Sequence, residues 1–132
     1  MRLLIPVLSI CGSLVSLPGL AQEVSWRELA AHPDRYIGKQ VEIRAAYCGN
    51  AGDNPGYQCS TDGALYILAK SLGPPRAKQK VDEDCGGMDV IERNASCRAH
   101  IRFIPNSYTT STAYDEGKTV VVINTGDAAL SF

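Results

Sequence analysis

Apolar and polar residues alternate without a break along residues 97–103. The apolar positions are Cys97, Ala99, Ile101 and Phe103, and the polar ones are Arg98, His100 and Arg102. A repeat of two places successive side chains on opposite faces of an extended chain, so this segment predicts a β-strand with one buried face. Pro105 and Asn106 follow it and are typical of the end of a strand.

Three other segments also predict strands. Residues 41–48 carry apolar or small residues at every second position from Val41 onward, which predicts another half-buried strand. Residues 64–69 are apolar throughout and predict a strand covered on both faces. Residues 119–123 predict a last strand, and the turn residues at 124–127 after it predict either a hairpin or a bent strand at the end of the chain.

One short helix is predicted near residue 25. Ser25 and Glu28 have the spacing of a capping box, in which each side chain accepts a hydrogen bond from an otherwise unpaired amide of the first turn. One face of this helix is apolar, formed by Trp26, Leu29 and Ala30. Pro33 is expected to end the helix, and Trp26 is expected to pack over the core.

Two long stretches lack a clear period. Residues 70–95 are expected to be mostly loop with one short element, a helical turn or edge strand at residues 89–93. Within them, the acidic run Asp82–Asp84 is interpreted as a solvated loop, because it lacks the spaced oxygen ligands and the glycine of a calcium loop. Residues 106–117 are expected to form a polar connection.

The helix and the strand after it have a spacing that resembles a known lead-in. The matching residues are Trp26, Leu29, Pro33, Tyr36, Gly38, Lys39, Val41, Ile43 and Arg44. The pattern is similar to that of small exported bacterial domains with an oligonucleotide/oligosaccharide-binding (OB) fold, and the strands at 97–103 and 120–123 resemble their closing strands. The resemblance implies a mainly β fold: a small, OB-like, partly open barrel with one short N-terminal helix. It implies no activity.

The first 21 residues have the order of a secretory signal peptide. Arg2 is followed by an uncharged apolar stretch, then by the helix breakers Pro18 and Gly19, and then by a small residue at Ala21. This order predicts cleavage between Ala21 and Gln22. The apolar stretch is shorter than the roughly 20 residues that span a bilayer, which disfavours an uncleaved membrane anchor.

Cleavage changes the composition of the chain. It leaves residues 22–132, which are enough for one domain, and no membrane span is expected in them. Of the 13 basic residues Arg2 leaves, so 12 face 14 acidic residues, a net charge of about −2. A slightly acidic domain disfavours nucleic acid as a partner, because non-specific binding to phosphates needs a basic surface.

Four of the five cysteines remain after cleavage. They are Cys48, Cys59, Cys85 and Cys97. An even number in an exported chain predicts two disulfides, with three pairings open. We favour pairing each cysteine with its neighbour in sequence, because both loops so closed are short and polar. A zinc site would need further close pairs of ligands, and two bridges would leave no thiol as a nucleophile.

Candidate chemistry is sparse. The sequence has no nucleophile elbow, zinc-protease, phosphate-loop or dinucleotide motif, so no cofactor and no catalytic residue are predicted. Arg98, His100 and Arg102 share the polar face of their strand and form a candidate binding stripe for a carboxylate or phosphate. The competing interpretation is an ordinary solvated strand face.

These patterns predict an exported binding or interaction module without catalysis, in a bacterial periplasm or secreted. Its partner would be a small molecule, a glycan or a protein, bound on the Arg98–Arg102 face with loops 49–58 and 106–117 at the rim. The alternative is a small secreted inhibitor that acts through the cystine-braced loop 48–59. An enzyme is disfavoured, because two histidines with these neighbours provide no nucleophile and base.

Overall fold

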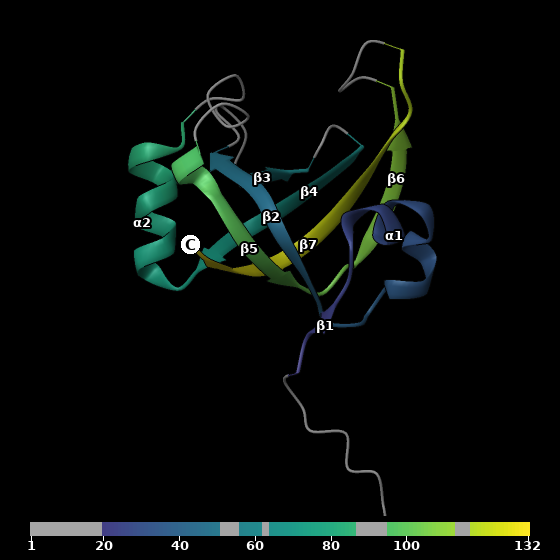
Figure 1. Cartoon of the computed structure of the whole chain (residues 1–132), viewed down its shortest axis with the longest axis horizontal. Helices are drawn as coiled ribbons and strands as arrows, with labels where there is room; N and C mark the ends of the chain where they lie inside the picture. The colour runs from purple at the N-terminus through teal and green to yellow at the C-terminus, as the bar shows by residue number, and fades with distance from the viewer. Residues whose placement is uncertain (1–19, 51–55, 62–63, 87–94, 113–116) are drawn as a thin grey trace, which may run out of the picture.

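The computed structural model describes residues 20–50, 56–61, 64–86, 95–112 and 117–132 (Figure 1). The predicted signal peptide up to residue 19 lies outside the described residues. The short element expected at residues 89–93 lies outside them as well.

Five strands form a closed barrel (Figure 1). They are β2 (Val41–Asn50), β3 (Tyr57–Ser60), β4 (Leu65–Gly73), β5 (Arg98–Phe103) and β7 (Val120–Ser131). Their order around the barrel is β2-β3-β4-β7-β5, and a β5–β2 pairing closes the ring. β4 and β7 run parallel, whereas the other neighbours are antiparallel. This is the strand order of an OB barrel, so the predicted mainly β, OB-like fold is confirmed, with a closed ring where a partly open one was expected.

Two more strands extend this sheet. The two residues of β1 (Gln22–Glu23) pair in parallel with the start of β2. β6 (Ser107–Ser111) pairs antiparallel with the first half of β7, at residues 120–124. The segment is polar and exposed as expected, but it also contains a strand, which was not expected. An exposed edge strand needs no apolar face, because its backbone bonds to the neighbouring strand while its side chains face water.

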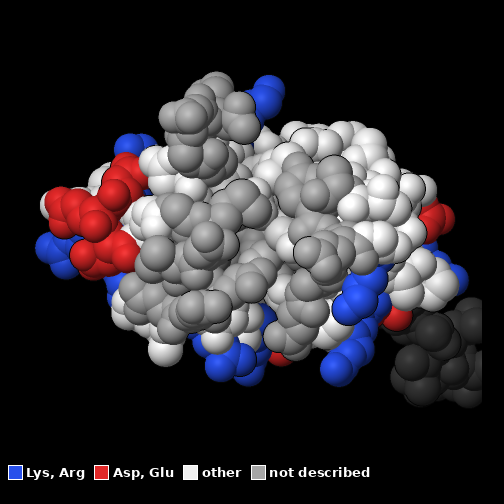
Figure 2. All heavy atoms as spheres, turned by 90° about the horizontal axis from the view of Figure 1, so that it is seen from above, with Lys and Arg blue, Asp and Glu red and all other residues white. Residues whose placement is uncertain are grey.

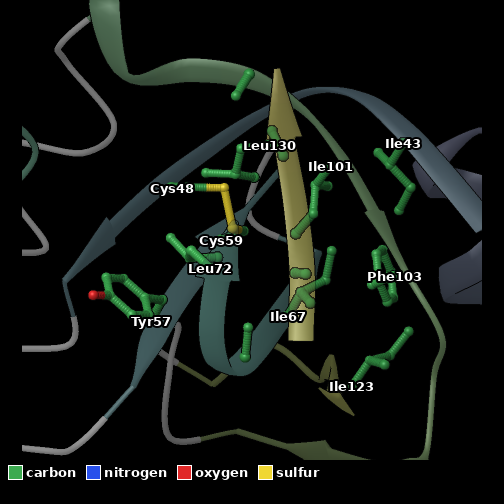
Figure 3. Packing of buried hydrophobic residues seen from close by; sticks show 14 of the residues in the cluster. Ile43, Cys48, Tyr57, Cys59, Ile67, Leu72, Ile101, Phe103, Ile123 and Leu130 are labelled. Atoms are coloured by element: carbon green, nitrogen blue, oxygen red, sulfur yellow. A yellow bond between two sulfur atoms is a disulfide. The ribbon is translucent and has the colours of Figure 1, made fainter. Parts of the chain in front are cut away.

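The core fills the barrel with one cluster of apolar side chains (Figure 3). β5 alternates between exposed and buried residues along its whole length, as its sequence predicts. Ile43, Ile67, Ile101 and Phe103 come from three different strands and are at most 2% exposed. Burial of such side chains contributes about 1.5–3 kcal/mol each before the entropy cost of folding is counted.

The alternation of β2 changes phase at Ala45. Ile43 and Ala46, rather than Ile43 and Ala45, face the core, and the register of β2 against β5 shifts between these two positions. Ala45 has φ 62°, in the left-handed region. The strict repeat expected for residues 41–48 is therefore broken by a bulge, which inserts one residue and bends the strand.

β4 and β7 also change phase, and they do so together. The buried residues of β4 run to Ala69 and resume at Leu72, and those of β7 run to Thr125 and resume at Ala128. The two strands remain paired where the alternation changes phase, as the pairing of Ser71 with Asp127 shows. The C-terminal segment is therefore one bent strand, which was one of the two forms expected, and the predicted turn residues mark its bend.

Helix α1 (Trp26–Ala31) and the 3-10 helix η1 (Pro33–Tyr36) lie on one side of the barrel, opposite helix α2 (Pro75–Asp84) (Figure 1). Leu29 of α1 is fully buried in the core cluster. Trp26 is partly buried and packs against the same cluster, as predicted. Together these two side chains close that side of the core.

Half of the predicted capping box is present at the start of α1. The Ser25 hydroxyl accepts a hydrogen bond from the Glu28 amide at 3.1 Å. The Glu28 carboxylate instead accepts one from the Tyr36 hydroxyl at 3.2 Å. The acidic residue of the box therefore ties α1 to η1.

Helix α2 (Pro75–Asp84) replaces the loop expected at this part of the chain. Ala77 and Val81 are buried four residues apart, so they lie on one helical face. On the exposed side Lys78 contacts Asp82 across one turn at 2.9 Å. The sequence prediction was wrong because two small apolar residues are enough when the helix covers an existing barrel.

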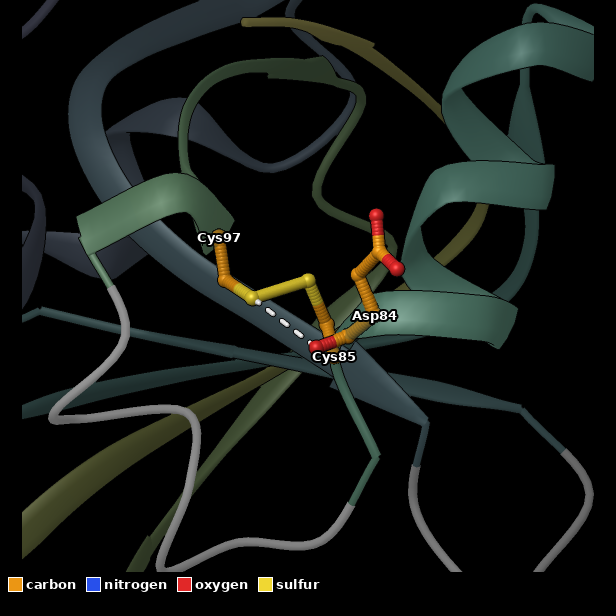
Figure 4. The surroundings of a disulfide bond; sticks show 3 residues. All are labelled: Asp84, Cys85 and Cys97. Atoms are coloured by element: carbon orange, nitrogen blue, oxygen red, sulfur yellow. Dashed lines mark hydrogen bonds between the residues drawn. A yellow bond between two sulfur atoms is a disulfide. The ribbon is translucent and has the colours of Figure 1, made fainter.

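Both disulfides have the favoured pairing. Cys48 and Cys59 lie opposite each other on β2 and β3, with Cα atoms 4.0 Å apart, and are fully buried (Figure 3). Cys85 and Cys97 join the end of α2 to the 3-10 helix η2 (Ala95–Cys97) before β5. The Cys97 sulfur lies 3.7 Å from the Asp84 carbonyl oxygen (Figure 4). A bridged sulfur has no proton to donate, so this contact packs the bridge against the last turn of α2.

Candidate functional site

The predicted stripe on β5 is exposed but is not one continuous basic surface. The Arg98 guanidinium lies over the Tyr47 ring, 5.8 Å from its centroid. His100 Nδ1 lies 3.8 Å from the Glu42 carboxylate. Arg102, at the far end of β5, borders a groove. The structure thus places the three residues on one strand face and gives each of them different surroundings.

The expected rim of this stripe has two parts. Residues 51–55 of the first loop lie outside the described residues. The second loop contains β6, which follows residues 120–124 of β7, whereas β5 follows residues 129–131. β6 therefore lies along the other half of β7 and does not flank Arg98.

The groove beside Arg102 has a volume of about 720 Å³. It lies on the outer wall where β4, β5 and β7 are adjacent, next to the start of β2. Its lining residues are Gln40, Ser71, Leu72, Gly73, Pro74, Arg102, Phe103, Ile104, Asp127, Ala128 and Ala129. A hollow forms here because Arg102 is paired with Ala129, and Ala129 with Gly73, so two of three neighbouring positions have little or no side chain.

The rim of the groove carries both signs of charge. The Ser71 hydroxyl donates a hydrogen bond to the Asp127 carboxylate. Arg102 is exposed, and within the described part of the chain its guanidinium forms no ion pair. Ile104 is 45% exposed and adds apolar surface next to Pro74. The arrangement can bind a molecule that has an apolar part and a polar or charged group.

The face that OB domains commonly use for ligands carries buried side chains in this protein. That face is formed by the second and third barrel strands, here β3 and β4. Gln58 and Ser60 of β3 are at most 6% exposed. Tyr66 of β4 is 5% exposed and packs in a second apolar cluster with Val120 and Val122 of β7. The groove at Arg102 is therefore more open to a ligand than this usual face.

A polar cluster that the sequence analysis missed lies between β3 and α2. The Tyr57 hydroxyl donates a hydrogen bond to Asp82 at 2.8 Å, and Lys78 donates to the same carboxylate at 2.9 Å. The Tyr57 ring belongs to the core, and its hydroxyl points away from it (Figure 3). The four-residue spacing of Lys78 and Asp82 could have indicated this pair in a helix, but the segment was expected to be a loop.

The pKa values in this cluster follow from its hydrogen bonds. The hydrogen bond from Lys78 lowers the pKa of Asp82, although partial burial opposes it. The hydrogen bond to Asp82 raises the pKa of Lys78. Burial, followed by the hydrogen bond to Asp82, raises the pKa of Tyr57. The three shifts favour a neutral Tyr57, a protonated Lys78 and an ionised Asp82, as expected for a structural cluster.

The acidic run Asp82–Asp84 forms the C-terminal end of α2. Figure 2 shows acidic side chains gathered at the end of the molecule that carries α2, with basic side chains next to them and at other places on the same face. Within the described ranges, no three His, Cys, Asp or Glu residues are placed to hold a metal ion. No helix of the described chain is long and apolar enough to cross a membrane.

The fold and the groove together define a small OB-like barrel with a candidate ligand site on its outer wall. No protein-family model matches the chain, and no curated protein matches it. A solved structure with a similar chain path is that of a "putative aspartyl-tRNA synthetase from Leishmania major Friedlin". It has a TM-score of 0.41 and 10% sequence identity, and the match covers 89% of this chain and 22% of that one. A likeness of this degree assigns no function.

Proposed function

We propose that this protein is an exported, non-catalytic binding module and that its ligand occupies the groove beside Arg102. One observation supports the proposal above the others: a hollow of about 720 Å³ with a partly apolar lining lies next to an arginine that forms no ion pair within the described residues. Binding sites for small molecules combine a concave apolar surface with a few polar groups that orient the ligand. The groove has both.

The distribution of titratable groups supports a role without catalysis. Among the residues that the structure describes, Tyr36, Tyr57, Lys78 and Asp82 have shifted pKa values, and each shift has a structural partner as one of its causes. All four lie outside the lining of the groove. We therefore assign them to stability rather than to a reaction.

Two buried disulfides support export. Cysteine pairs of this kind form and persist in oxidising compartments, which include the bacterial periplasm and the extracellular space. Together with the predicted signal peptide they favour a periplasmic or secreted protein. The slightly acidic charge favours a small molecule over nucleic acid as the ligand.

The inhibitor alternative receives less support. Cys48 and Cys59 face the inside of the barrel, where their bridge joins β2 to β3 within the core. The bridge thus stabilises the barrel wall as much as the loop beyond it. We therefore place the binding site in the groove.

A ligand screen mapped by protein-observed NMR tests the proposed site. The full chain would be produced with its own N-terminal segment, purified in oxidised form, and screened against small acids, amines and neutral polar compounds. We expect binders to shift the amide signals of Gly73, Ile104 and Ala129. Arg102→Gln should weaken acidic binders several-fold, whereas the matched control Arg98→Gln, on the same strand but outside the groove, should not. Binders that shift only signals outside the groove would refute the site.

A further inference from the structure

We infer that the groove binds a small zwitterion with an apolar side chain, for which a free α-amino acid is the simplest form. This inference rests on the proposed function, because it names the ligand class of the same groove. It is carried by the positions of Arg102 and Asp127 on either side of a hollow with an apolar wall.

Strand register fixes the distance between the two charges. Arg102 of β5 lies opposite Ala129 of β7, and Asp127 lies two residues before Ala129 on the same strand. The two charged residues are therefore diagonal neighbours on one face, with Cα atoms about 7–8 Å apart. Ala129 and Gly73 lie beside them and leave the space between the charges unfilled.

Neither charge is neutralised by a neighbour within the described residues. Glu42 lies opposite Arg102 on β2, but its carboxylate lies 3.8 Å from His100 and forms no ion pair with Arg102. The Asp127 carboxylate accepts a hydrogen bond from Ser71, which orients it and leaves its negative charge in place. A guanidinium binds carboxylates with paired hydrogen bonds, and a carboxylate accepts them from an ammonium group.

The groove also restricts what else the ligand can carry. A diacid or a phosphate ester would place a second negative charge next to Asp127, and a simple amine would leave the Arg102 guanidinium without an anionic partner. The exposed side chain of Ile104 and the ring of Pro74 provide an apolar wall for a branched aliphatic side chain. An amino acid such as leucine satisfies the three requirements together.

Four probes of matched shape test the inference in the full-length oxidised protein. They are leucine, N-acetylleucine, which lacks the ammonium group, leucinamide, which lacks the carboxylate, and 4-methylpentanoate, which lacks the amino group altogether. NMR titration of the Ala129 and Ile104 amides would give each Kd. We expect leucine to bind about tenfold more tightly than each of the other three, because each lost charge-assisted hydrogen bond costs about that factor.

Variants assign each charge. Arg102→Gln should abolish the preference for leucine over leucinamide, and Asp127→Asn should abolish the preference for leucine over N-acetylleucine. Arg98→Gln should change neither. The Arg102 and Asp127 side chains are exposed, and unchanged thermal unfolding would show that each variant is folded.

The outcomes separate this inference from the proposed function. If N-acetylleucine or leucinamide binds as tightly as leucine, the zwitterion assignment is wrong and the groove remains a ligand site. If no probe binds while other screened compounds shift the groove signals, the ligand class is wrong and the proposed function stands. If nothing shifts those signals, both are wrong.

Discussion

Tyr57 brings a hydroxyl group to the boundary between an apolar core and solvent. The residue is 8% exposed and its ring packs in the core cluster, while its hydroxyl reaches Asp82 on α2 at 2.8 Å. An unpaired hydroxyl at this depth would be costly, so Asp82 compensates a polar group that β3 places inside. Lys78 in turn holds the carboxylate ionised. The cluster is therefore expected to contribute stability that depends on pH.

Tyr57→Phe should lower the free energy of unfolding by about 1–2 kcal/mol at neutral pH, because it removes a hydrogen bond to a charged acceptor. The pKa of Asp82 is lowered in the folded protein, so its contribution is complete above the usual carboxyl pKa and is lost as the pH falls through and below that range. The difference between the wild-type protein and Tyr57→Phe should therefore shrink in acid. Urea unfolding of both proteins at pH 7 and pH 3 measures it.

Tyr36→Phe is the matched control. Its hydroxyl bonds to Glu28 at 3.2 Å on a more exposed surface, so its removal should cost less than that of the Tyr57 hydroxyl. A Tyr57→Phe effect that is the same at both pH values would show that Asp82 ionisation plays no part.

The backbone conformation of Ala45 could not be predicted from its residue type. Alanine disfavours the left-handed φ of 62°, because its Cβ approaches the following carbonyl oxygen, and its position in an alternating run predicts an ordinary strand residue. The bulge arises because β2 must pair with both β3 and β5 while it curves around the barrel. Closure of the barrel, a tertiary requirement, determines this backbone conformation.

At the level of elements, the strands with a strong period were predictable and the others were not. β5 has the alternation of a half-buried strand and β4 begins with an apolar run, and both formed, although β4 extends to Gly73, into a stretch expected to be loop. α2 has only Ala77 and Val81 facing the core, and β6 has no buried residue, so neither has a clear apolar period. Both depend on the barrel: α2 packs on β2 and β4, and β6 extends β7.

The dependence of α2 on so small an apolar face gives a test. Val81 is fully buried, so Val81→Ala should lower the free energy of unfolding by about 1.5–3 kcal/mol through lost burial and the cavity left behind. Gln79→Ala is the control on the exposed face, where only a hydrogen bond to Glu83 is lost, and should change stability by less than about 0.5 kcal/mol. Chemical unfolding of both variants compares them; equal effects would mean that α2 is not held by its apolar face.

The candidate site was predictable only in part, because most of its residues come together only through the pairing of distant strands. Arg102 was identified from its place on the polar face of β5, which is local information. Its partners in the groove come from segments far apart in the sequence, with Ser71 and Gly73 on β4 and Asp127 on β7. They meet through the parallel pairing of β4 and β7, which no periodicity along the chain encodes.

At the scale of the whole molecule, the predicted cleavage site lies directly before β1, which pairs with the barrel strand β2. Leu20 is 78% exposed, and two residues later the Gln22 amide donates a hydrogen bond to the Gln40 carbonyl at 3.1 Å. Leu20, the second residue before the predicted cut, is thus exposed, and Gln22, the first residue after the cut, is paired with β2 through β1. Cleavage between Ala21 and Gln22 would keep every strand of the barrel.

We therefore expect the protein recovered from a bacterial periplasm to begin at Gln22 and to be four hydrogen atoms lighter than its reduced form, because both disulfides are closed. Intact mass spectrometry measures both features, and thiol titration without reductant should find no free thiol. Ala21→Leu places a bulky residue where the peptidase needs a small one and should cause the uncleaved form to accumulate, whereas Leu20→Val should be processed normally. A wild-type mass that retains the first 21 residues, or free thiols in the folded protein, would contradict the export assignment.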